Sequence, residues 1–200
     1  MKIYVALLLL TPPVLATMAT ENCASGWTMV KREMGNWCIQ VLPGTINVKQ
    51  ADQKCRELGA VLTGVENEAE RQLIHAAGVK ILRSVNQTEG AIWLGARRRT
   101  ACLHPNTNAT GCVPWVPNAY EWTDGFTTGR KMFQFRPRQP NYWNHQDRIY
   151  MGIVDGKIGK RGFKSGELED ALGSATFNKQ AYWCLRGYAC GKKPTITNYI

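Results

Sequence analysis

Seven cysteines, all downstream of an apolar N-terminal segment, constrain this chain of 200 residues more than any other feature. Lys2, the apolar run Ile3–Leu10 and the small residues Ala16 and Ala19 form the pattern of a secretory signal peptide. We therefore assign residues 1–19 to a signal peptide that is cleaved after Ala16 or Ala19. Because cysteines of secreted chains form disulfides, we expect a secreted, extracellular domain stapled by such bonds.

Composition narrows the class of protein further. Hydrophobic residues make up 44% of the chain, which is enough for a core, and no later apolar run is long enough to span a membrane. The formal net charge of +10 favours anionic partners such as acidic glycans, although it also serves solubility alone. Secretion argues against nucleic acid. Sequons at Asn86 and Asn108 predict N-glycosylation of exposed loops.

Local patterns predict two helices and several short strands. Asn47 is placed to cap a helix that ends near Gly59, and Asn67 to cap a second helix that ends near Gly78. Strands are expected at residues 27–31, 38–42, 60–62, 91–95, 150–154 and 182–190, with a long loop region between 96 and 150, an insertion loop over 155–176 and a frayed tail over 191–200. Long loops of this kind usually carry function.

The sequence carries no pattern typical of an enzyme. It has no glycine-rich phosphate loop and no nucleophile elbow, and its histidines lack metal-ligand spacing. The acidic cluster Glu167–Asp170 resembles an acid pair, but it follows Lys160 and Lys164, so we interpret it as a solvated charge run in a surface loop. We expect a binding protein without catalytic residues, metal or other cofactor.

Segments spread along the chain resemble the C-type lectin-like domain, in the secreted, single-domain form found in invertebrates. They are Cys23…Gly26-Trp27…Cys38, Ala51-x-x-x-Cys55-x-x-x-Gly59-Ala60-x-Leu62, Trp93-Leu94-Gly95, Trp122-Thr123-Asp124-Gly125, Gln139-Pro140-Asn141, and Cys184 with Cys190. On this basis we assign residues 20–190 to the domain and 191–200 to a C-terminal tail. The resemblance implies an α+β fold, with two helices, small antiparallel sheets and a long loop region that carries the ligand site.

The resemblance also implies a disulfide pattern. The expected pairs are Cys23–Cys38, Cys55–Cys190 and Cys102–Cys112, the last being an addition seen in some invertebrate members. Arg148 stands where the family has the cysteine that pairs with Cys184, so we expect Cys184 to be left unpaired within the chain. Cys184 is then either a buried thiol or the site of an intermolecular disulfide that links a homodimer.

The calcium site of the family is degenerate in this sequence. The family tripeptide carries Glu or Asp beside proline, whereas Gln139-Pro140-Asn141 has no carboxylate. The acid expected before the next strand aligns with Gln146, and the Trp-Asn-Asp triplet aligns with Phe177–Lys179. Because neutral amide oxygens do not offset the dehydration of a divalent cation, we predict that Ca²⁺ is not bound. The candidate ligand-binding residues are Gln139, Pro140, Asn141, Gln146, Asn178 and Lys179.

By this resemblance the chain is a secreted lectin-like binding protein that binds carbohydrate without dependence on Ca²⁺. Trp115, Tyr142 and Trp143 are candidates for stacking on a sugar, with core packing as the alternative. The basic runs Arg97–Arg99 and Lys157–Lys164 would suit an anionic glycan. The alternative function is a protein-binding module that keeps the fold and has lost the sugar site.

Overall fold

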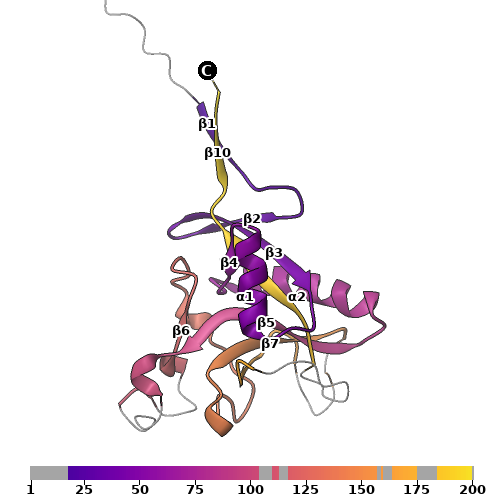
Figure 1. Cartoon of the computed structure of the whole chain (residues 1–200), viewed down its shortest axis with the longest axis vertical. Helices are drawn as coiled ribbons and strands as arrows, with labels where there is room; N and C mark the ends of the chain where they lie inside the picture. Colours follow the sequence, from indigo (N-terminus) through magenta and orange to yellow (C-terminus); the bar gives the residue numbers. More distant parts are fainter. Residues whose placement is uncertain are drawn as a thin grey trace, which may run out of the picture.

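The computed structural model describes residues 18–103, 110–112, 117–156, 159, 164–174 and 184–199. It has the expected α+β fold, with two helices packed against a mixed sheet (Figure 1). The elements are β1 (Met18–Asn22), β2 (Thr28–Arg32), β3 (Gly35–Pro43), α1 (Val48–Glu57), β4 (Val61–Leu62), α2 (Glu68–Ser84), β5 (Glu89–Arg98), β6 (Tyr120–Trp122), β7 (Arg148–Val154), β8 (Leu168–Ala171), β9 (Leu185–Lys192) and β10 (Thr195–Tyr199).

The main sheet has the strand order β2-β3-β9-β5-β7-β8, with β4 on β9 and β6 on β5. Its central strand, β5, is buried on both faces and runs parallel to β9. Ile92 and Leu94 enter the core that includes the apolar side chains of α2, whereas Ala91 and Trp93 enter the core that includes those of α1. This double burial explains the unbroken apolar run that predicted the strand.

The first helix begins where the sequence predicts. The Asn47 side chain accepts the backbone N–H of Gln50, and the Gln50 amide oxygen accepts the backbone N–H of Asn47. This reciprocal pair is a capping box. Cys55 on the buried face of α1 forms a disulfide with Cys190 of β9, across 135 residues of sequence. In the chain-entropy model a loop of this length makes such a bond worth about 4–5 kcal/mol.

The second helix is longer than predicted. Asn67 caps it as expected, but it continues through Gly78 to Ser84. A Cβ atom at Gly78 would lie 2.9 Å from Cγ1 of Ile153, so the glycine lets α2 approach β7 closely. Gly78 is therefore a packing residue, and the prediction that it ends the helix was wrong.

The pairings expected for the remaining cysteines are also present, as disulfides Cys23–Cys38 and Cys102–Cys112. Cys184 lies outside these bonds, and its side chain is only 2% exposed. A sulfur buried in this way would need local movement to reach a second chain. The homodimer linked through Cys184 stays a prediction, which electrophoresis without reductant tests.

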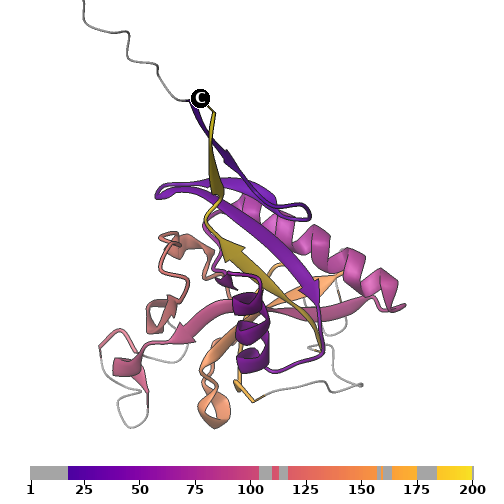
Figure 2. The same ribbon diagram turned by 45° about the horizontal axis from the view of Figure 1, so that its top comes forward.

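The two ends of the described chain form a ribbon that extends from the body of the molecule (Figures 1 and 2). β1 pairs with β10 in antiparallel register, from Met18 opposite Tyr199 to Asn22 opposite Thr195. Residues 195–199 are thus a strand, where a frayed tail was expected. Met18 and Ala19 belong to β1 although they fall within the segment assigned to the signal peptide.

A strand also replaces part of the expected insertion loop. β8 pairs antiparallel with β7, placing Ala171 opposite Arg148 and Glu169 opposite Tyr150. This strand brings two carboxylates to the long loop region, which changes the site. Among the described residues, no helix is both long enough and apolar enough to cross a membrane.

Candidate functional site

A pocket of about 270 Å³ lies where the long loop meets β7, β8 and β9. Three residues predicted for the site, Gln139, Asn141 and Gln146, line it together. Pro140 lies between the first two and follows a cis peptide bond. The other predicted residues, Asn178 and Lys179, lie outside the described part of the chain, as do Trp115 and Asn108.

Sequence reasoning missed the two carboxylates of the pocket, Glu169 and Asp170. Their side chains come from β8 and are buried, with 7% and 0% of each residue exposed. The interpretation of Glu167–Asp170 as a solvated charge run was therefore wrong for these two residues. Leu168–Asp170 also fits the apolar-polar-acid order of the family triplet, which is the signal that would have found it.

Asp170 fixes the conformation of the loop through its two oxygen atoms. Oδ2 accepts the backbone N–H of Tyr142 at 2.7 Å and the hydroxyl of Tyr120 at 3.0 Å. Oδ1 accepts the backbone N–H of Asn141 at 3.2 Å. Burial raises the pKa of Asp170, and the bonds from Tyr142 and Asn141 only partly oppose this increase.

Glu169 has a cationic neighbour within the protein. Arg136 donates from Nη1 to Oε2 of Glu169 at 2.9 Å, and the Gln139 amide donates to Oε1 at 3.3 Å. Arg136 is positioned by the backbone, since its N–H donates to the carbonyl of Leu168 in β8. Burial raises the pKa of Glu169, and the charge of Arg136 opposes the increase without cancelling it.

The loop between Asn141 and Gln146 carries strain and an exposed tryptophan. Tyr142, Asn144 and His145 all have positive φ angles, between 52° and 62°. Such conformations are unfavourable for residues other than glycine and cluster at functional sites. The Asn141 side chain accepts the backbone N–H of Trp143, whose own side chain is 70% exposed.

Arg98 is a buried cation that packs against Tyr142 of this loop. It is 1% exposed, and its guanidinium carbon lies 4.0 Å from the centre of the Tyr142 ring. It also donates to the carbonyl oxygens of Cys102 and Cys112, at 2.8 and 2.6 Å. Of the basic run Arg97–Arg99, which the sequence offered as a partner for an anionic glycan, only Arg97 is exposed, and Arg99 is half-buried.

The carboxylate oxygens of the pocket are already engaged by partners within the chain. Calcium takes six to eight oxygen ligands, with carboxylates among them. Here both oxygens of Asp170 accept hydrogen bonds from the loop and Tyr120, and Glu169 accepts from Arg136 and Gln139. Within the described ranges no group of three or more His, Cys, Asp or Glu residues is placed to hold a metal ion. The guanidinium of Arg136 lies beside the carboxylate of Glu169.

Known proteins of similar fold differ in calcium dependence. A calcium-independent type II antifreeze protein matches with a TM-score of 0.55 at 16% identity, covering 88% of this chain and 98% of that one. The calcium-free form of a Ca²⁺-dependent type II antifreeze protein matches with a TM-score of 0.53, also at 16% identity, covering 85% and 99%. The cow C-type carbohydrate-recognition domain of CD23, in a structure with an oligosaccharide, gives 0.54 at 16% identity, covering 88% and 99%. These likenesses establish the fold and leave the metal open.

Comparison of sequences also relates this chain to C-type lectins. Layilin of Mus musculus is 30% identical over 83 residues, which is 42% of this chain and 19% of layilin, so the chain matches about a fifth of that protein's length. The family model described as C-type lectin domain-containing protein 141/158 matches residues 28–193. That match spans nearly all of the sheet and both helices, and this chain therefore belongs to the C-type lectin domain family.

Proposed function

We propose that this protein is an extracellular lectin that binds carbohydrate at the loop pocket without calcium. C-type lectin-like domains are generally binding modules rather than enzymes. The observation that carries the proposal is Trp143, a large aromatic side chain that is 70% exposed at a pocket lined by Gln139, Asn141 and Gln146. An exposed ring stacks on the apolar face of a sugar, and amides donate to and accept from its hydroxyl groups.

Calcium independence follows from the charges of the pocket. In a site that uses the metal, carboxylates hold the cation and the cation helps to hold the loop. Here Arg136 supplies positive charge to Glu169, and Asp170 holds the loop through Asn141 and Tyr142. The loop is thus preorganised by the chain itself, and preorganisation lowers the cost of binding.

An extracellular location agrees with the chemistry of the described chain. Its three disulfides need an oxidising compartment to form. Asn86, one of the two predicted glycosylation sites, lies in an exposed turn after α2. Mass spectrometry of the secreted protein tests both the modification and the cleavage of the signal peptide.

A glycan array tests the proposal, with the secreted protein applied in calcium and again in chelator. We expect binding that is equal in the two buffers and lost in Trp143→Ala. Met34→Ala is the matched control, because Met34 is a large apolar side chain that is 55% exposed and lies outside the pocket. Binding that requires calcium would contradict the proposal. Absence of glycan binding in both buffers would also contradict it, and would favour the protein-binding alternative.

A further inference from the structure

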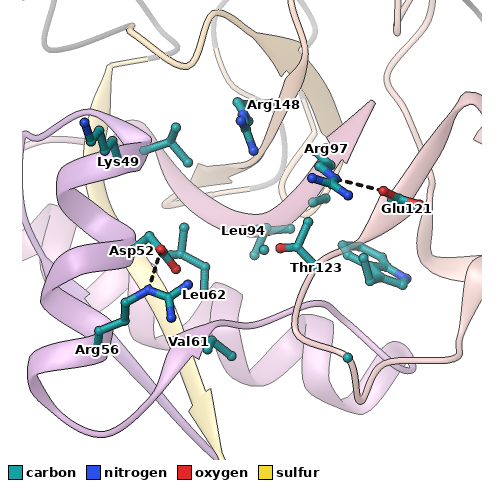
Figure 3. A pocket seen from close by; sticks show the side chains of 15 residues that line it. Lys49, Asp52, Arg56, Val61, Leu62, Leu94, Arg97, Glu121, Thr123 and Arg148 are labelled. Atoms are coloured by element: carbon teal, nitrogen blue, oxygen red, sulfur yellow. Dashed lines mark hydrogen bonds and ion pairs between the residues drawn. The ribbon is translucent and has the colours of Figure 1, made fainter. Parts of the chain in front are cut away.

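A second and larger hollow, of about 670 Å³, lies between α1 and the strands β5 and β6 (Figure 3). Leu62 and Leu94 form an apolar floor, and the Thr123 hydroxyl faces the hollow. Its volume falls within the range typical of small-molecule sites. We call it the α1 groove, and none of the candidate residues of the loop pocket lines it.

The charges around the α1 groove are mainly positive. Its basic lining residues are Lys49, Arg56, Arg97 and Arg148, and its acidic ones are Asp52 and Glu121. Arg56 pairs with Asp52 and Arg97 with Glu121, as Figure 3 shows. These pairs are exposed, so they are weak and a ligand can compete for them. The lining therefore attracts an anion but also offers carboxylates that accept hydrogen bonds.

The sheet itself places two of these arginines opposite each other. Arg97 of β5 and Arg148 of β7 are register partners, and like charges in this position destabilise a sheet. They meet because the register shifts between Trp93 and Arg97, so that β5 contains extra residues relative to β7. A bound anion would relieve the repulsion that this geometry creates.

Each arginine of the groove uses only part of its hydrogen-bond donors within the protein. Arg56, Arg97 and Arg148 make their ion pairs through Nε, at 2.9, 2.8 and 3.3 Å. Among the described residues, no hydrogen bond engages the terminal Nη atoms of these three arginines. A guanidinium has five donors in a planar fork, so each side chain can keep its carboxylate and still hold an oxyanion.

We propose that the α1 groove binds a sulfated saccharide. A sulfate group presents three terminal oxygens, so one group accepts from both Arg97 and Arg148, whereas a carboxylate matches a single fork. Asp52, Glu121 and Thr123 accept from sugar hydroxyls. An inorganic anion would need only the donors. This inference does not rest on the loop pocket, and either site can fail without the other.

Calorimetric titration of the whole secreted protein with a heparin tetrasaccharide tests the proposal, alongside the same tetrasaccharide after chemical desulfation. We expect binding of the sulfated probe, and no measurable binding of the desulfated one. Arg97→Gln and Arg148→Gln should each weaken binding about tenfold, the order expected for a lost hydrogen bond to a charged group. Thr123→Val should weaken it less.

A matched control separates a built site from diffuse attraction. Lys31→Gln with Lys80→Gln removes the same charge as the Arg97→Gln/Arg148→Gln pair, from exposed positions outside the groove. We expect this control to bind the probe about as well as the wild type, and Trp143→Ala to do the same. Equal weakening by the two double variants would overturn the proposal, as would binding of the desulfated probe or failure of the sulfated one. Melting temperatures of all variants confirm that they fold.

Discussion

Arg32 and Arg136 each contact buried carboxylates, but the surroundings of the two ion pairs differ in burial and in the pKa of the carboxylates. Beneath the loops, Arg32 donates to Glu70 through Nε and Nη2, and to Asp124 through Nη1, with all three side chains almost fully buried. At the loop pocket, Arg136 donates to Glu169 through Nη1 and its side chain is 20% exposed. The ion pairs of Arg32 are shielded from solvent, whereas the ion pair of Arg136 is partly exposed to it.

The carboxylates respond differently in the two regions. Burial opposes ionisation of Asp124, but hydrogen bonds from Thr127, Phe126 and Gly64 outweigh it and lower the pKa of Asp124. At the pocket, burial dominates and raises the pKa of both Glu169 and Asp170. Carboxylates in a cleft whose pKa is raised by burial are candidates for ligand sites, although structural ion-pair networks also shift pKa values. From this contrast and from the contact of Arg136 with Glu169 at the pocket, we propose a structural role for Arg32 and a role in the site for Arg136.

The largest expected effect is on stability at the structural network. Arg32→Met leaves Glu70 and Asp124 buried without their cation, and breaking a buried pair in this way costs about 3–5 kcal/mol. Urea denaturation with the disulfides intact measures the loss. A loss below that of the pocket variant described next would break the comparison.

A smaller loss is expected at the pocket. Arg136→Met removes the cation of Glu169 and leaves this carboxylate with hydrogen bonds from Gln139 and Tyr150. We expect a decrease of about 1–2 kcal/mol in the free energy of unfolding, together with weaker glycan binding. The same denaturation experiment checks the first quantity and the array checks the second. Unchanged glycan binding would remove Arg136 from the site.

The pH dependence of stability should have opposite signs in the two regions. Asp124 has a lowered pKa, so its stabilising contribution is present above pH 3.8, its ordinary value, and is lost as the pH falls through the folded value. Asp170 has a raised pKa, so its contribution is greatest below pH 3.8 and declines as the pH rises through the folded value. Unfolding curves of Asp124→Asn and Asp170→Asn against the wild type measure both slopes. Parallel slopes in the two variants would contradict the contrast.

The smallest effect on stability is expected for Trp143→Ala. The side chain is largely exposed, so its removal should change the free energy of unfolding by about 0.5 kcal/mol or less. Its loss should nevertheless abolish glycan binding. A large destabilisation would instead mean that the ring supports the loop, and it would weaken the case for a sugar-stacking role.

The sequence predicts local features well, because their causes are local. The capping residues Asn47 and Asn67 act on the turn that follows each of them, so both helix starts were placed correctly. The loop tripeptide at Gln139 and the disulfides followed from the resemblance to a family. Gly78 was misjudged because its role is set by Ile153, which is distant in sequence.

The pocket was only half predictable for the same physical reason. An acidic run beside lysines is solvated in most proteins, and only the likeness of Leu168–Asp170 to the family triplet sets this run apart. Their partners, Tyr120 and Arg136, lie 50 and 33 residues earlier in the chain. Arg98 is buried by distant tyrosines in a similar way. Burial of a charge depends on what the fold brings to it, which a local pattern does not contain.

The central claim is that the chain itself does at the loop pocket what calcium does elsewhere in the family. The most direct test is the melting temperature of the wild-type protein in calcium and in chelator. An ion that binds the native state but not the unfolded chain stabilises the protein by an amount that grows with the logarithm of its concentration above Kd, so bound calcium would raise the melting temperature. The account predicts the same melting temperature in both buffers. A higher melting temperature in calcium would contradict it, and would mean that Glu169 and Asp170 exchange their present partners for the metal.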